Sequence, residues 1–83
     1  MAKVFEDLEF IPYGADNRRA VLKFENGLYI SVLTGPIAIA DESGPYEAAI
    51  LDQDGEYVNN TIRNHLTAED VTAFMKEIQE ISL

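Results

Sequence analysis

The stretch AVLKFENGLYISV, residues 20–32, decides the fold that we predict for this chain. Apolar and polar residues alternate on both sides of Glu25-Asn26-Gly27, as they do in two β-strands that each bury one face. Two connections between these strands are conceivable. A two-residue Asn-Gly turn would place Phe24 opposite Tyr29 and mix the two faces, whereas a three-residue loop pairs Phe24 with Leu28.

The three-residue loop keeps the apolar side chains together. It directs six of them to one face: Ala20, Leu22, Phe24, Leu28, Ile30 and Val32. Because register normally keeps a buried set on one face, we predict this loop, with a type I turn, a bulge and a left-handed Gly27. The opposite face is expected to be partly exposed and carries Val21, Lys23, Tyr29 and Ser31.

A second hairpin is predicted around the loop Gln53-Asp54-Gly55, with Gly55 left-handed as well. The same kind of loop gives three cross-strand pairs: Ile50 with Val58, Ala48 with Asn60 and Tyr46 with Ile62. A buried Asn60 would need hydrogen-bond partners. We therefore expect the final strand to fade or twist at this residue.

The remaining segments are less regular. Residues 4–11 form an apolar segment in which Leu8 and Phe10 alternate with Glu9 and Ile11 as in a strand, and Pro12 ends it. Residues 13–17 have the composition of a turn. Residues 37–40 form a short apolar run that fits more than one type of structure, so the sheet is expected to have four or five strands.

The helix signals lie near the end of the chain. Thr67 is a favourable N-cap, and Asp70 stands at the N3 position of a capping box. Leu66 and Val71 have the spacing of a hydrophobic staple. An apolar stripe at helical spacing follows: Val71, Phe74, Met75, Ile78 and Ile81. This stripe should close over one face of the sheet, giving a single α+β domain, residues 1–83, with an antiparallel sheet packed on one C-terminal helix.

The charge of the chain limits the partners that it can bind. Fifteen acidic residues against six basic ones give a formal net charge of −9. This charge argues against direct binding to nucleic acid or to an anionic membrane, and it permits binding to a basic protein surface. The chain has no cysteine and no long apolar run at its start, so we expect a location in the reducing cytoplasm.

The sequence offers no motif for catalysis or metal binding. His65 is the only histidine, so neither a nucleophile pair nor a zinc site can be assembled. Its position before the helix indicates a loop residue or a residue that flanks the helix N-terminus. Residues 52–56 (DQDGE) look like part of a calcium loop, but the position that needs a bidentate Glu is Arg63. We predict no catalytic residue, no metal, no cofactor and no enzymatic activity.

Candidate interface residues are therefore sought on the surface. Tyr29 is included because tyrosine is enriched at binding hot spots. Acidic clusters on a small rigid scaffold can imitate the spacing of phosphates, although a solvated face that keeps the protein soluble explains each cluster as well. The candidate acids form three clusters: Glu6, Asp7 and Glu9; Asp41 and Glu42; Asp52, Asp54 and Glu56.

Residues 24–32 (FENGLYISV), 44–51 (GPYEAAIL) and 66–71 (LTAEDV) together form a familiar pattern. It consists of a Phe-x-Asn-Gly hairpin, a Gly-x-Tyr-Glu-x-Ala strand and a Leu-Thr-x-Glu-(Glu/Asp)-Val helix start. Over residues 20–83 the chain thereby resembles small acidic proteins encoded by bacteriophages and prophages, although residues 56–64 depart from the pattern. The resemblance implies a viral protein that acts in the bacterial cytoplasm against a host or defence protein, as anti-CRISPR and anti-restriction factors do.

From these observations we expect a non-enzymatic protein that binds and inhibits a bacterial protein. Two alternatives stay open. A small-molecule binder would need a pocket between helix and sheet, near Phe74 and Met75. A homo-oligomeric structural or assembly protein would form a homodimer on an exposed edge or face of the sheet.

Overall fold

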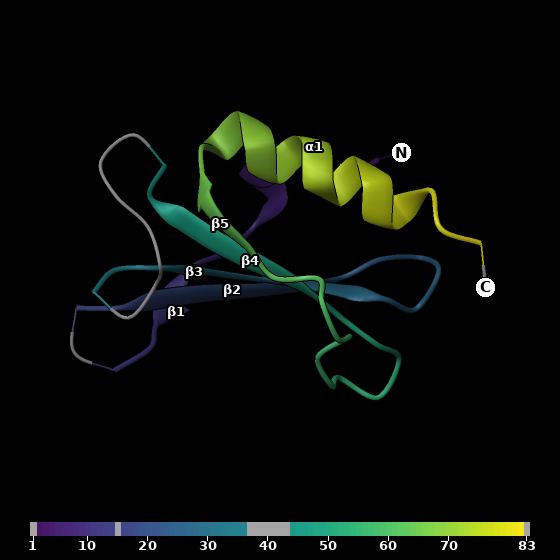
Figure 1. Ribbon diagram of the computed structural model, residues 1–83, viewed down its shortest axis with the longest axis horizontal. Coiled ribbons are helices and arrows are strands. Elements are labelled where there is room, and N and C mark those ends of the chain that lie inside the picture. The colour runs from purple at the N-terminus through teal and green to yellow at the C-terminus, as the bar shows by residue number, and fades with distance from the viewer. Residues whose placement is uncertain (1, 15, 37–43, 83) are drawn as a thin grey trace.

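The computed structural model describes residues 2–14, 16–36 and 44–82 (Figure 1). They form an antiparallel sheet of five strands in the order β1-β2-β3-β4-β5, one short 3-10 helix and one α-helix. The elements are η1 (Phe5–Asp7), β1 (Ile11–Pro12), β2 (Arg18–Lys23), β3 (Tyr29–Thr34), β4 (Tyr46–Leu51), β5 (Arg63–Leu66) and α1 (Ala68–Gln79). The predicted α+β fold is confirmed, with five strands. The apolar run at residues 37–40 lies outside the described residues.

The first hairpin has the register that its apolar pattern predicts. Leu22 pairs with Ile30, and Ala20 pairs with Val32. The Phe24 backbone N–H donates to the Leu28 carbonyl at 2.8 Å, which closes the three-residue loop. Gly27 has a φ of 90°, in the left-handed region that a side chain disfavours. The three-residue loop and the left-handed conformation of its glycine are therefore confirmed.

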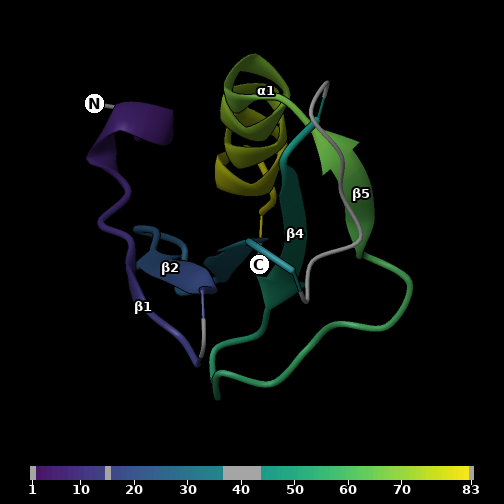
Figure 2. The ribbon, with the colours of Figure 1, turned by 90° about the vertical axis from the view of Figure 1, so that its left-hand side faces the viewer.

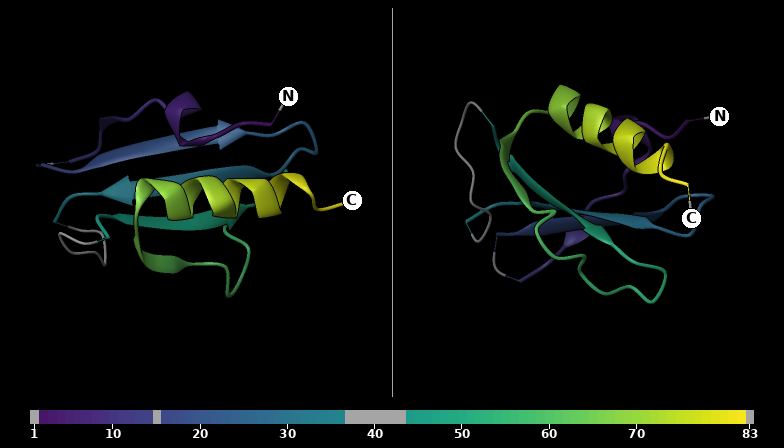
Figure 3. Two further views of the ribbon diagram at one scale, coloured as in Figure 1. Left: turned by 90° about the horizontal axis from the view of Figure 1, so that it is seen from above. Right: turned by 45° about the vertical axis from the view of Figure 1, so that its right-hand side comes forward.

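The sheet curves around α1, which fills its concave side (Figure 2). Seen from above, α1 runs over β3 and β4, near the middle of the sheet (Figure 3). The core joins residues of the sheet to the predicted stripe of the helix: Phe24, Leu28, Ile30, Val32, Ala48, Val71, Phe74, Met75 and Ile78. Burying each large apolar side chain of this set contributes about 1.5–3 kcal/mol. The predicted stripe is too long by one residue, because α1 ends at Gln79 and Ile81 is 39% exposed.

The start of α1 has the predicted cap. The Asp70 N–H donates to Thr67 Oγ1 at 3.1 Å, and the Thr67 N–H donates to Asp70 Oδ2 at 3.0 Å. These two bonds satisfy backbone donors that have no partner inside the helix. Leu66, just before the cap, packs against the core that contains Val71, as the staple spacing predicts.

The second hairpin begins as predicted and then departs from the predicted register. The Val58 N–H donates to the Ile50 carbonyl at 3.0 Å, and Gly55 has a φ of 82°. Farther along, Ala48 pairs with Arg63 rather than with Asn60. Tyr46 likewise pairs with Leu66, so the prediction that it faces Ile62 is wrong.

The side chain of Thr61 explains this shift. Its Oγ1 donates to the Val58 carbonyl at 2.7 Å and accepts from the Ile50 N–H at 3.1 Å, replacing the strand that would otherwise pair there. Asn60 turns the chain with a φ of 65° and stays exposed, so it needs no buried partner. The strand resumes at Arg63, which places His65 in β5. Of its two predicted positions, the one flanking the N-terminus of α1 is confirmed and the loop is not.

The predicted strand over residues 4–11 is wrong except at its end, where Ile11–Pro12 forms β1. Asp7 Oδ2 accepts from the Val4 N–H at 2.9 Å and closes the turn of η1. Leu8 and Phe10, whose spacing suggested a strand, pack against the core together with Phe5. The ring of Phe5 lies 5.9 Å from that of Phe10 and 5.1 Å from that of Tyr46, measured between centroids.

Two glycines provide a test of the second half of the sheet. A Cβ on Gly44 would collide with the backbone of His65, whereas a Cβ on Gly55 would meet no atom within 4 Å. Gly44→Ala should lower the free energy of unfolding by about 2 kcal/mol or more, because backbone must move. Gly55→Ala should lower it by only about 1 kcal/mol, because alanine disfavours the left-handed conformation of this residue. Urea unfolding of both variants measures the difference, and equal losses would contradict the close packing of β5 on Gly44.

The capping box predicts a pH dependence. Thr67 lowers the pKa of Asp70 by hydrogen bonding to its carboxylate. The largest contribution comes from the Thr67 backbone N–H, and a smaller one comes from its side chain. The ionised Asp70 carboxylate therefore contributes fully to the stability of the fold above the pKa of an aspartate in the unfolded chain, about 3.9. This contribution is lost as the pH falls toward the lower pKa of the folded state.

Asp70→Asn should flatten the acid side of the stability profile, measured by chemical unfolding from neutral to acidic pH. Glu69→Gln, in the same helical turn, is the control for the loss of one charge. If the stability of Asp70→Asn falls as steeply at acidic pH as that of Glu69→Gln, the capping box does not have this role.

Candidate functional site

The predicted acidic clusters do not form one site. Glu6 and Asp7 lie in η1, which packs beside the start of α1, and Glu9 follows η1 (Figure 2). The second cluster, Asp41 and Glu42, lies outside the described residues. The third cluster, residues 52–56, forms the loop after β4, well away from η1 (Figure 1).

Helix η1 brings its acids to the N-terminal end of α1. The Phe5 N–H donates to Thr72 Oγ1 at 3.0 Å, which holds η1 against the helix. As a result, Glu6 and Glu69 line one shallow depression of about 270 Å³ together with Ala68 and Thr72. Residues far apart in the sequence thus share one surface, and no basic residue lines it.

We name this surface the acidic ridge and define it by its two acids, Glu6 and Glu69. Asp7 and Asp70 each accept a hydrogen bond from a backbone N–H and are held in place. The side-chain carboxylates of Glu6 and Glu69 have no hydrogen bond or ion pair with any other described residue. The sequence placed Glu69 and Asp70 at a helix start, but it held no signal that η1 would dock beside them.

The loop after β4 uses one of its acids for its own structure. Asp52 Oδ1 accepts from the Asp54 N–H at 2.9 Å and from the Glu56 N–H at 3.0 Å. This is turn chemistry of the kind that aspartate supports. Asp54 and Glu56 stay exposed on the loop. Of the predicted third cluster, Asp52 thus stabilises the loop, and Asp54 and Glu56 remain as exposed surface acids.

Tyr29 belongs to a different surface from the predicted acids. It lies on the face of the sheet that is turned away from α1, which we name the convex face. Lys23 Nζ lies 5.9 Å from the centroid of its ring. The sequence correctly placed Lys23 and Tyr29 on one face, but it also predicted partial exposure for Ser31, which is only 3% exposed. Arg19 covers Ser31 and donates to its hydroxyl oxygen from Nε at 3.1 Å.

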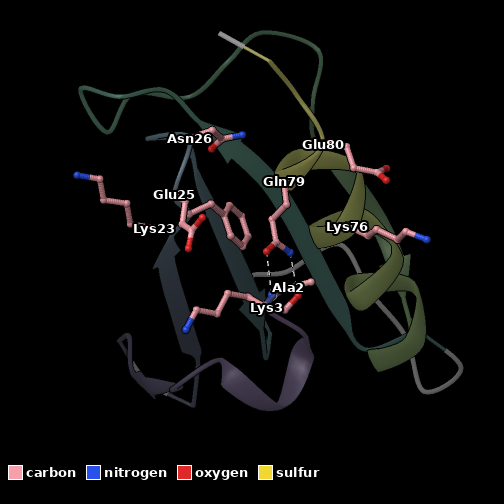
Figure 4. Close-up of a pocket in the computed structure, with 9 residues that line it drawn as sticks. Ala2, Lys3, Lys23, Glu25, Asn26, Lys76, Gln79 and Glu80 are labelled. Atoms are coloured by element: carbon pink, nitrogen blue, oxygen red, sulfur yellow. Dashed lines mark hydrogen bonds between the residues drawn. The ribbon is translucent and has the colours of Figure 1, made fainter.

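A groove of about 410 Å³ lies between the N-terminal segment, the loop before β3 and the C-terminal end of α1 (Figure 4). Its lining is formed by Ala2, Lys3, Lys23, Phe24, Glu25, Asn26, Lys76, Gln79 and Glu80. Lys23 and Lys76 extend from its rim in opposite directions (Figure 4). Phe74 and Met75, near which the small-molecule alternative expects a pocket, do not line this groove, and their side chains are 2% and 0% exposed in the core.

Side-chain amides build the walls of this groove. Gln79 Oε1 accepts from the Lys3 N–H at 2.8 Å, and Gln79 Nε2 donates to the Lys3 carbonyl at 2.9 Å (Figure 4). On the other side, Asn26 Nδ2 donates to the carbonyls of Ile78 and Ile81 at 2.9 and 3.1 Å. The loop of the first hairpin and the N-terminal segment are thus both tied to the end of α1.

Arg63 links β5 to α1 and neutralises an acid of the helix. Its two terminal nitrogens donate to the Glu77 carboxylate at 2.9 Å each, and its guanidinium lies 4.1 Å from the centroid of the Phe74 ring. These hydrogen bonds raise the pKa of Arg63 and lower the pKa of Glu77. Glu77 is therefore a paired acid, in contrast to Glu6 and Glu69.

Within residues 2–14, 16–36 and 44–82, no three acidic or histidine side chains are grouped so that they could hold a metal ion. No helix in this part of the chain has the length and apolarity of a membrane span. Comparisons with protein-family models, with curated proteins and with solved structures find no match to this chain.

The Gln79 amide predicts a local effect on the N-terminal segment. Gln79→Ala removes both hydrogen bonds to Lys3, so exchange of the Lys3 amide proton should become about ten-fold faster. The amide of Ile30, in the middle of the sheet, should keep its exchange rate. Hydrogen exchange followed by NMR measures both, with Lys76→Ala on the same helix as the control. Unchanged exchange at Lys3 would show that this segment is held by other contacts.

Proposed function

We propose that this protein is a non-enzymatic binding module that docks its acidic ridge on a basic surface of a bacterial protein and inhibits it. One observation carries the proposal. Glu6 and Glu69 come together from opposite ends of the sequence, line the same depression and have no partner among the described residues. Two unpaired carboxylates on adjoining helices are available to an external cation.

The structure holds these carboxylates at little entropic cost. η1 is fixed to α1 by the Thr72 hydroxyl, and Asp7 and Asp70 cap the turns that carry the ridge. Because the backbone is already ordered, binding would immobilise only the two glutamate side chains. The net charge of −9 adds long-range attraction to a basic target and accelerates the encounter.

The chemistry of the ridge selects a class of target. A protein surface that binds nucleic acid is lined with lysine and arginine, and fixed carboxylates compete for it with phosphate groups. The resemblance to phage-encoded proteins points to a host or defence protein in the bacterial cytoplasm, such as a target of anti-CRISPR or anti-restriction factors. We therefore place a nucleic-acid-handling defence protein first among the partners.

The edges of the sheet favour a surface partner over a strand-paired homodimer. β1 has two residues, and one of them is Pro12, which has no N–H to donate. β5 has four residues, and His65 within it has a φ of 57°. Short, irregular edge strands are poor templates for adding another strand.

Charge reversal can show whether binding depends on the acidic ridge itself or only on the net charge of the protein. The double variant Glu6→Lys/Glu69→Lys should weaken binding to the partner at least ten-fold, a loss of about 1.4 kcal/mol. Asp54→Lys/Glu56→Lys changes the net charge by the same amount at the loop after β4 and should bind nearly as the wild type does. Partners are captured from bacterial lysate at low and moderate salt, and the dissociation constant of each variant is then measured with the captured protein.

Three results would count against this proposal. Equal losses in both double variants would mean that only the net charge attracts the partner. Partners that all dissociate at moderate salt would indicate non-specific attraction of basic proteins. If the captured partner keeps its activity in the complex, the protein binds this partner but does not inhibit it.

A further inference from the structure

The convex face differs in charge from the acidic ridge, because it carries basic side chains from β2 beside one acid of β4, Glu47. Side chains of β2 alternate between the two faces of the sheet, so Arg19, Val21 and Lys23 all belong to the face away from α1. Two of the six basic residues of a chain with a net charge of −9 are therefore on one sheet face. α1 covers only the concave side (Figure 2), and Arg19 is half-buried on the opposite face.

Arg19 is held in a defined position. Its Nε donates to the hydroxyl of Ser31 at 3.1 Å, and its guanidinium carbon lies 5.5 Å from the centroid of the Tyr13 ring. Ser31 is 3% exposed and so provides a fixed acceptor. The Tyr13 N–H donates to the Asn17 carbonyl at 2.8 Å, which closes the turn that positions the ring. Backbone and buried groups thus restrain the guanidinium on two sides.

The two terminal nitrogens of Arg19 have no hydrogen-bond partner among the described residues. A planar guanidinium with its Nε engaged presents the other N–H donors as a fork that matches the two oxygens of a carboxylate. A side chain already fixed in this position loses little entropy when it binds. This arrangement is suited to receive one carboxylate.

The surroundings of Arg19 are apolar and exposed. Ile11 is its cross-strand neighbour and is 59% exposed, while Val21, two residues along β2, is 44% exposed. Such a surface matches a partner that presents a carboxylate beside apolar side chains. We infer that the convex face is a second binding surface, which takes an acidic polypeptide segment with apolar neighbours and holds its carboxylate on Arg19.

Two other occupants fit these observations less well. A nucleic acid strand would bring many phosphates to one fixed guanidinium and would be repelled by the net charge of −9. A second copy of this chain carries the same charge and meets the same repulsion. A single carboxylate on an otherwise apolar segment avoids both costs. Because this surface and the acidic ridge share no residue, this inference does not depend on the proposed function.

A random peptide library displayed on phage, selected against the immobilised full-length protein at physiological salt, tests the inference. Enriched peptides should carry an Asp or Glu flanked by apolar residues. The best synthetic peptide should bind Arg19→Lys about ten-fold or more weakly, because lysine keeps the charge and loses the fork. Arg18→Lys is the matched control, since Arg18 is the exposed neighbour in β2 whose side chain alternates to the other face, and it should bind as the wild type does.

Ser31→Ala provides a second variant that keeps the arginine. It removes the acceptor for Nε, so the affinity for the peptide should fall by roughly three- to ten-fold. Equal binding by wild type and Arg19→Lys would overturn the inference, as would a library that yields no acidic peptide. Binding of an oligodeoxythymidine strand that is lost in Arg19→Lys would assign this face to nucleic acid instead. Self-association that is lost in Arg19→Lys, measured by sedimentation, would assign it to a second copy.

Discussion

The closure of α1 over the concave side of the sheet is the constraint on which the rest of the molecule depends. A sheet of this size exposes one apolar face that it cannot bury alone. The four buried side chains of α1 supply the missing half of the core: Val71, Phe74, Met75 and Ile78. This single packing layer also determines where the N-terminal segment lies, because η1 attaches to the flank of the helix through Thr72. The acidic ridge and the groove of Figure 4 are both consequences of this attachment.

Local signals predicted the elements whose structure local chemistry decides. The register of β2 and β3 follows from the loop at Gly27 and from the alternation of apolar residues, and the start of α1 follows from Thr67 and Asp70. The predictions failed where a side chain replaces the backbone as a partner. Thr61 takes over the hydrogen bond of Ile50 and displaces the last strand, and no residue pattern announces such an exchange. In residues 4–11, Leu8 and Phe10 pack against the core without belonging to a strand, so their spacing is not specific to a strand.

The candidate site was predictable only in part, for a related reason. The acids of η1 were recognised as a cluster, but Glu69 joins them only through the tertiary packing of η1 on α1. The composition of the convex face was predictable, because strand alternation assigns Lys23 and Tyr29 to one side. The restraint of Arg19 was not, since it requires the turn that carries Tyr13 to fold back beside β2. Sequence thus indicates which face a residue occupies better than it indicates which distant residue will adjoin it.

The attachment of the N-terminal segment to the last helix has a consequence for synthesis on the ribosome. Phe5 and Lys3 find their hydrogen-bond partners in Thr72 and Gln79, which are translated 67 and 76 residues later. The acidic ridge therefore cannot form until α1 has been synthesised, although Glu6 is made long before Glu69. A premature stop before α1 yields a fragment without this surface, and a partner that recognises the ridge distinguishes finished molecules from unfinished ones.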